Sequence, residues 1–163
     1  MNKQDIETLV QFNFWANSRI IKACEGLTNE AFVRDVEPNP GWKSLRDILV
    51  HTLDTEFGWR MLLQGENADQ ILQPADFPDL PRLKRQWLIE ETAWTDYLAG
   101  LSNGDLSQRY GEDSASRLNV WQTIMHVVGH GIQHRSEAAF ILTGYGCSPG
   151  ELDFDLFLAE LDR

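Results

Sequence analysis

The feature that most restricts the fold of this chain is an apolar pattern that repeats at helical spacing over four long segments. These segments run from residue 6 to about 23, from 44 to 65, from 81 to about 100 and from 120 to 143. Apolar residues three and four positions apart lie on one face of a helix, so each segment has a stripe that must be buried. No convincing set of strands accompanies them. We therefore expect an all-α protein, a four-helix bundle.

Residues suited to helix ends stand at the borders of these segments. Ser44, with Asp47 three positions later, resembles an N-terminal cap, and Asn119 can cap the last long helix. Pro81 suits an early position of the third helix. In that helix, Lys84, Arg85, Glu90 and Glu91 are expected to face water. Glycines expected to stop the helices are Gly26, Gly65 and Gly144.

The connecting segments contain few helical signals. Residues 29–41 and 66–81 carry prolines, and the first of these suits a long connection better than a helix. Residues 106–120 lack the helical period and form either a loop or a short hairpin turning around GEDS at 111–114. The tail DFDLFLAEL, residues 153–161, is short and amphipathic, and we expect it to dock on the bundle as a final helix.

Length and charge limit the domain organisation and the partners. The 163 residues suit one domain spanning 1–163, with 42% apolar and 24% charged residues. A net charge of −11 repels phosphate backbones and anionic lipid headgroups, so neither nucleic acid nor a membrane is an expected partner. The first residues, MNKQDIETLV, enter the amphipathic pattern at once. We therefore expect no leader, no membrane span and a cytoplasmic location.

The two cysteines, Cys24 and Cys147, are far apart in sequence and form no CxxC pair. They indicate neither a disulfide framework nor a cysteine zinc site. Each is interpreted as a small buried apolar residue, with a redox role as the alternative.

The histidines are the candidate ligands for a metal ion. His130 and His134 are four positions apart, so their side chains lie on one helix face and can bind one ion together. A metal of this class needs a third protein ligand, and His51 lies in the otherwise apolar segment DILVHTLDTE. In a bundle, this helix can face the last one. The alternative for His51 is a hydrogen-bonded core histidine.

Two further residues lie beside this candidate site. His126 is one turn before His130 and turned away from His134, so it is assigned to the surroundings of the site or to the helix surface. Glu137 returns to nearly the angle of His130 and could orient a ligand imidazole or a metal-bound water. An ordinary solvated glutamate is the alternative.

Three imidazole ligands would leave a divalent ion with its full charge and an open position for water or substrate. Such an ion makes a bound water or thiol nucleophilic at neutral pH. Imidazole ligands suit zinc and nickel alike, so the sequence does not choose between them.

The motifs QFNFWANSRI, SLRDILVHTLDTEFGW and HVVGHGIQHRSE, in this order, resemble those of the DinB superfamily, and LDFDLFL is similar to its closing segment. The resemblance covers almost the whole chain. It implies a bundle of up-down-down-up topology with long crossover connections, a metal held by His51, His130 and His134, and a homodimer. It also implies a small-molecule substrate and a low-molecular-weight thiol such as bacillithiol, mycothiol or glutathione. This chain has His-Arg-Ser-Glu at 134–137 where many members have His-Arg-Gly-Gln.

Three functions follow as hypotheses. The first is a metal-dependent enzyme that activates a thiol or water for attack on a small electrophile, an S-transferase, isomerase or hydrolase. Arg135, Trp15 or Trp59 could position the substrate. The second is a non-catalytic stress-response protein with a structural ion, closed by a fourth ligand from Asp47 or Glu137. The third is a dimeric bundle without a metal.

Overall fold

The computed structural model describes residues 1–37, 41–111 and 117–161. The described residues form helices and contain no strand, which confirms the predicted all-α class. The four long helices are α1 (Lys3–Cys24), α3 (Leu45–Leu63), α4 (Leu80–Gly100) and α5 (Val120–Gly144). The shorter elements are α2 (Asn29–Val33), α6 (Phe154–Leu161) and the 3₁₀ turns η1 (Pro74–Asp76) and η2 (Asp105–Ser107).

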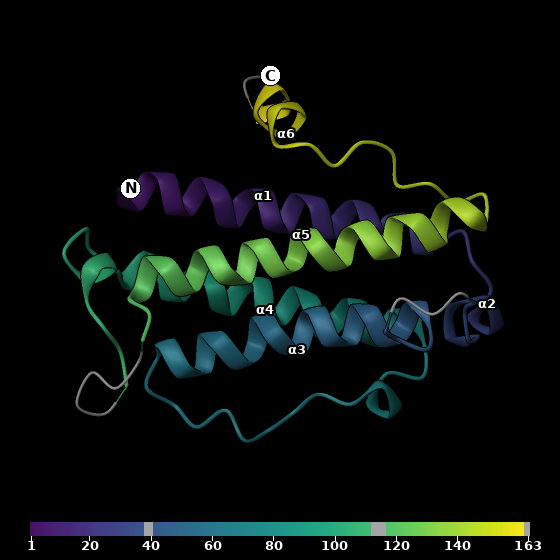
Figure 1. Cartoon of the computed structure of the whole chain (residues 1–163), viewed down its shortest axis with the longest axis horizontal. Coiled ribbons are helices and arrows are strands. Elements are labelled where there is room, and N and C mark those ends of the chain that lie inside the picture. Colours follow the sequence, from purple (N-terminus) through teal and green to yellow (C-terminus); the bar gives the residue numbers. More distant parts are fainter. Residues whose placement is uncertain (38–40, 112–116, 162–163) are drawn as a thin grey trace.

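The long helices have the predicted up-down-down-up topology (Figure 1). At one end of the bundle, an apolar cluster joins the starts of α1 and α5 to the ends of α3 and α4. At the other end, a second cluster joins the ends of α1 and α5 to the starts of α3 and α4. Because α3 and α4 run in the same direction, the segment between them must travel the length of the bundle.

The helix ends follow the predicted caps. The Ser44 hydroxyl accepts a hydrogen bond from the backbone N–H of Asp47 at 3.2 Å. Asn119 and Gln122 form a reciprocal capping box at the start of α5. These contacts satisfy N–H groups that have no partner within the helix. Both helices that carry histidines 51, 130 and 134 therefore begin where the sequence predicted.

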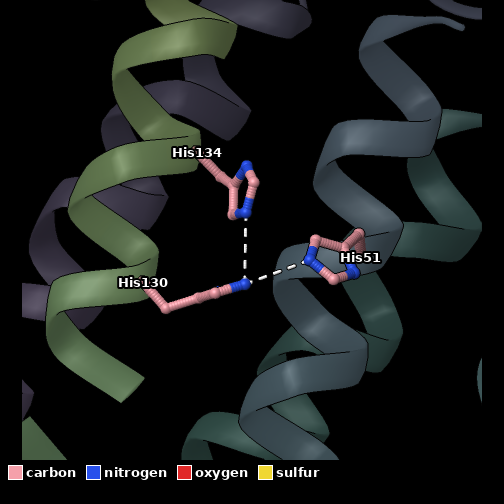
Figure 2. A group of neighbouring side chains, drawn as sticks. All are labelled: His51, His130 and His134. Carbon is pink, nitrogen blue, oxygen red and sulfur yellow. Dashed lines mark hydrogen bonds between the residues drawn. The ribbon is translucent and has the colours of Figure 1, made fainter. Parts of the chain in front are cut away.

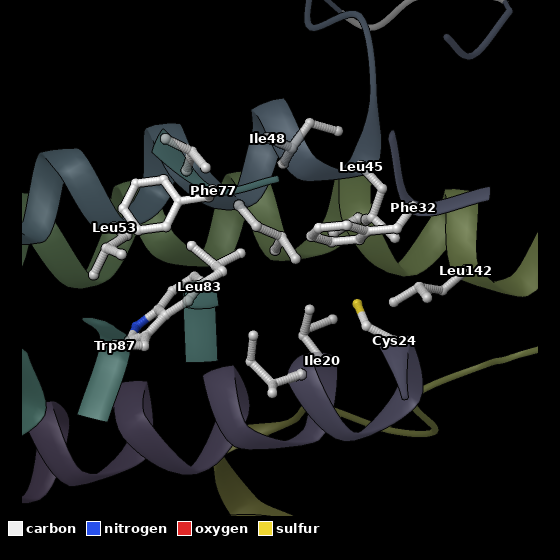
Figure 3. Packing of buried hydrophobic residues seen from close by; sticks show 14 of the residues in the cluster. Ile20, Cys24, Phe32, Leu45, Ile48, Leu53, Phe77, Leu83, Trp87 and Leu142 are labelled. Atoms are coloured by element: carbon white, nitrogen blue, oxygen red, sulfur yellow. The ribbon is translucent and has the colours of Figure 1, made fainter. Parts of the chain in front are cut away.

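The larger apolar cluster lies at the end of the bundle that contains α2 (Figure 3). Leu45, Ile48 and Leu53 of α3 point into it together with Trp87 of α4. Phe32 of α2 also enters this cluster, with 2% of its surface exposed.

The structure corrects the prediction for residues 29–41, which contain the short helix α2. The Thr28 hydroxyl caps it by accepting from the N–H of Ala31 at 3.2 Å. Burial of Phe32 outweighs the weak helical propensity of five residues, since most helix stability in proteins comes from packing.

A second correction concerns Glu90, which was expected to face water and is only 1% exposed. Both oxygens of its carboxylate accept hydrogen bonds from the guanidinium of Arg60, at 2.6 and 2.9 Å. A long-range partner on α3 therefore makes burial of this charged position possible.

The segment before α5 shows one element of the predicted hairpin alternative. Arg109 and Asn119 form an isolated antiparallel bridge, and the N–H of Val120 donates to the Gln108 carbonyl. Most of the predicted GEDS turn lies outside the described residues, because 112–116 are not included.

The tail forms the predicted helix, α6, and docks on α1. Phe157 is 3% exposed and its ring lies 5.8 Å from those of Phe12 and Trp15. Glu160 accepts hydrogen bonds from the Trp15 indole at 2.8 Å and from Arg19 at 2.7 Å. In the described part of the chain, none of the helices combines the length and apolarity needed to cross a membrane.

Candidate metal centre

Three histidines from two facing helices direct their ring nitrogens to one point (Figure 2). His51 comes from the second turn of α3, and His130 and His134 come from adjacent turns of α5. The Nε2 atom of His130 lies 3.0 Å from Nε2 of His51 and 3.1 Å from Nε2 of His134. One ligand atom from each residue lies within 4.8 Å of the others. The predicted trio is therefore brought together by the fold.

The contacts among these nitrogens cannot all be hydrogen bonds. Nε2 of a neutral imidazole has one in-plane site, which holds either a proton or a lone pair. Nε2 of His130 therefore has one such site for two neighbouring nitrogens. A single cation between the three atoms would use a lone pair from each ring.

Glu137 sets the tautomer of His134. Its Oε2 atom lies 2.7 Å from Nδ1 of His134. Because a carboxylate only accepts hydrogen bonds, Nδ1 carries the proton and Nε2 keeps its lone pair. The sequence predicted that Glu137 could orient a ligand imidazole. The contact between Glu137 and Nδ1 of His134 has the geometry of such an interaction.

The surroundings favour neutral imidazoles. Burial and, to a smaller extent, the neighbouring His134 and His51 lower the pKa of His130 to about 4. Burial also lowers the pKa of His51, followed by the effect of His134. Neutral rings are the form that binds a metal ion.

Trp42 covers one side of the cluster. Its ring stacks on that of His51, with centroids 4.1 Å apart and an interplanar angle of 23°, and it meets His134 edge-on at 5.9 Å. Backbone pairing holds the Trp42 segment, because the N–H of Val36 donates to the Lys43 carbonyl at 2.8 Å. Sequence reasoning missed Trp42, since it lies outside any periodic segment and only its nearness to the Ser44 cap places it beside α3.

His126 lies at the exposed edge of the same face of α5. Its ring centroid is 6.1 Å from that of His130 and 5.2 Å from that of Trp59. It is not part of the group of converging nitrogens. The assignment of His126 to the helix surface agrees with this position.

The comparison with known proteins decides the family. The sequence model of the DinB family matches residues 1–161. This chain belongs to the DinB family. Protein DinB of Bacillus subtilis (strain 168) is 20% identical over 166 residues, and the match covers 95% of this chain and 95% of that protein.

In this DinB-family chain, the two acidic residues considered as a fourth ligand are engaged elsewhere. Glu137 bonds to the nitrogen of His134 that faces away from the cluster. The Asp47 carboxylate accepts hydrogen bonds from the guanidinium of Arg46 at 3.3 Å. Among the residues that the structure describes, the group of candidate ligands around this point consists of the three histidines.

Residues of the DinB-family motifs also meet in a separate buried polar network around Glu56. Glu56 accepts hydrogen bonds from Asn13 at 2.6 Å and Asn17 at 2.9 Å through Oε1, and from the Trp87 indole at 3.1 Å through Oε2. Burial raises the pKa of Glu56, against the effect of these hydrogen bonds.

Arg135 joins this network from α5. Its Nη1 donates to Oδ1 of Asn13 at 2.6 Å and of Asn17 at 2.8 Å, and the residue is 3% exposed. Arg135 therefore connects α5 to α1.

Trp15 packs under α6. The sequence analysis considered Arg135 and Trp15 for positioning the substrate. The structure instead places both outside the candidate site.

Proposed function

We propose that this chain is a metal-dependent enzyme in which His51, His130 and His134 bind a divalent transition metal, zinc or nickel. The observation that carries the proposal is the position of Nε2 of His130, which lies 3.0 and 3.1 Å from two other imidazole nitrogens. Nitrogen ligands of a tetrahedral zinc ion are separated by roughly 3.3 Å, given zinc–nitrogen bonds of 2.0–2.1 Å. The donor set therefore fits such an ion.

The three-histidine set supports catalysis rather than a structural role. A structural zinc site is closed by a fourth protein ligand, whereas Glu137 and Asp47 have other partners. When bound, the ion would supply a positive charge that makes a coordinated thiol or water nucleophilic at neutral pH.

The residues of this chain have separate tasks in the proposed site. Glu137 holds the His134 ring with its Nε2 lone pair directed to the cluster. Trp42 keeps water from one face of His51 by stacking on it. The proposed reaction is attack of a low-molecular-weight thiol, or of water, on a small electrophile. The thiol rests on the family resemblance alone.

Metal binding is tested first, on protein purified without a histidine tag. Elemental analysis and chelator competition are expected to give one zinc or nickel ion per chain. His51→Ala and His134→Ala should abolish tight binding, whereas His126→Ala, the matched histidine outside the cluster, should keep it. Equal metal content in all variants, or no metal in the wild type, contradicts the proposal.

Activity is tested separately. Metal-loaded protein is assayed with bacillithiol, mycothiol, glutathione and water as nucleophiles against a panel of small electrophiles, with His130→Ala as the comparison. We expect turnover that depends on His130 and on one of these nucleophiles. Tight metal binding with identical background rates for wild type and His130→Ala would instead support the structural ion.

A further inference from the structure

The two cysteines, although far apart in sequence, lie against the same apolar cluster at the end of the bundle that contains α2. Cys24 is the last residue of α1 and is 1% exposed. Cys147 is partly buried in the segment that follows α5, and it packs against the cluster that contains Cys24. Both side chains are free thiols.

The backbone holds Cys147 in this position. Its N–H donates to the carbonyl of Leu142 at 2.9 Å, and the Leu142 side chain lies beside Cys24 in the core (Figure 3). The chain passes close to the end of α1 because residue 26 is glycine. A Cβ atom at Gly26 would lie 3.0 Å from Sγ of Cys147. Sγ of Cys147 therefore lies close to the backbone of Gly26, two residues after Cys24.

The two thiols also differ in reactivity. Burial and, to a smaller extent, the neighbouring Cys147 raise the pKa of the Cys24 thiol to about 12. Since the thiolate is the form that reacts with an oxidant, the raised pKa protects Cys24 from direct oxidation. Cys147 is the more accessible of the two.

We propose that Cys24 and Cys147 are a redox-active pair that a peroxide oxidises to an intramolecular disulfide. The Cys147 sulfur attacks one oxygen of hydrogen peroxide. The O–O bond breaks, and water leaves with the thiol proton, which produces a sulfenic acid. The Cys24 sulfur then forms the S–S bond as the S–O bond breaks, and a second water leaves with the Cys24 proton. Two thiols lose two electrons, and the peroxide is reduced to two waters.

The disulfide would join the end of α1 to the segment between α5 and α6. It would close a loop of most of the chain, and such a cross-link restricts the unfolded state strongly. The oxidised protein is therefore expected to unfold at a higher temperature than the reduced protein. This pair is separate from the histidine cluster and does not rest on the function proposed above.

The test uses the full-length native protein, with a chelator present so that the histidine cluster plays no part. Reduced protein is treated with hydrogen peroxide, unfolded, alkylated with a maleimide and analysed by intact mass and peptide mapping. We expect a monomer lighter by two hydrogen atoms that takes up no maleimide and contains a peptide joining Cys24 to Cys147. Its melting temperature should fall to that of the reduced protein after addition of dithiothreitol.

Single variants separate the two steps. In Cys24→Ser, Cys147 should accumulate as a sulfenic acid that dimedone traps, whereas wild type should show little trapping. In Cys147→Ser, Cys24 should remain reduced in the folded protein. Equal trapping in wild type and Cys24→Ser, disulfides only between chains, or a disulfide formed only in urea would each overturn the proposal. Circular dichroism confirms that the variants are folded, and the wild-type mass result stands without them.

Discussion

Nδ1 of His134 lies 2.7 Å from Oε2 of Glu137, one turn further along α5. A carboxylate at this nitrogen fixes the tautomer of the imidazole and increases its basicity. We predict that Glu137→Ala weakens metal binding by about 10–100-fold. Glu137→Gln keeps an oxygen that accepts from Nδ1 and removes only the charge, so its loss should be smaller. Competition with a chromophoric chelator measures both affinities, and unchanged affinity in Glu137→Ala would remove this role.

The stacking of Trp42 on His51 predicts an optical signal for metal binding. Nickel or copper bound at the histidines would lie close to the indole and quench its fluorescence, whereas zinc, with a filled d shell, should quench little. We expect a fluorescence loss that saturates with metal content and is largely absent in Trp42→Phe.

Six tryptophans contribute to the emission, so only part of the total intensity should be lost. Trp15→Phe is the matched control, because Trp15 lies under α6 and bonds to Glu160. Equal quenching in both variants would contradict the placement of the metal beside Trp42.

Gly129 and Gly131 lie two positions apart on α5, on nearly opposite faces of the helix, and are predicted to respond in opposite ways to alanine. A Cβ atom at Gly131 would lie 2.6 Å from Nη1 of Arg135 and 2.7 Å from Oδ1 of Asn13, both buried. Gly131→Ala should therefore cost about 1–3 kcal/mol of unfolding free energy. Gly129 has no atom within 4 Å of such a Cβ, so Gly129→Ala should increase stability by about 0.5–1 kcal/mol. Urea denaturation of the two variants beside wild type measures both values.

Glu91 predicts a pH dependence of stability. Burial and, to a smaller extent, the nearby Glu56 raise the pKa of Glu91 from an ordinary value of 4.5 to about 7. The folded state therefore binds this proton more tightly than the unfolded state. The contribution of Glu91 to stability is complete below pH 4.5 and is lost as the pH rises through about 7.

Glu91→Gln cannot ionise, so it should be more stable than wild type above the folded pKa and close to wild type at low pH. Urea denaturation across this pH range measures the difference between the two proteins. A difference that does not change with pH would show that Glu91 ionises alike in both states.

Glu90 and Trp42 show where prediction from the sequence ends. Lys84 and Arg85 of α4 are exposed as predicted, but Glu90 is buried against Arg60, thirty positions away. Trp42 belongs to no periodic pattern, so only the folded chain shows that it stacks on His51. Periodicity reports which helix face is apolar, and it carries no information about a specific partner on another helix.

The sequence by itself determined the four long helices, the caps at Ser44 and Asn119, and the shared helix face of His130 and His134. These features depend on spacing along one chain segment, where helix geometry relates position directly to direction. Only the tertiary structure decided which groups became neighbours across segments: Arg60 with Glu90, Arg135 with Asn13 and Asn17, and Cys147 with the end of α1. Such pairs arise when helices pack, because burial of their apolar faces sets the positions in which polar groups must find partners.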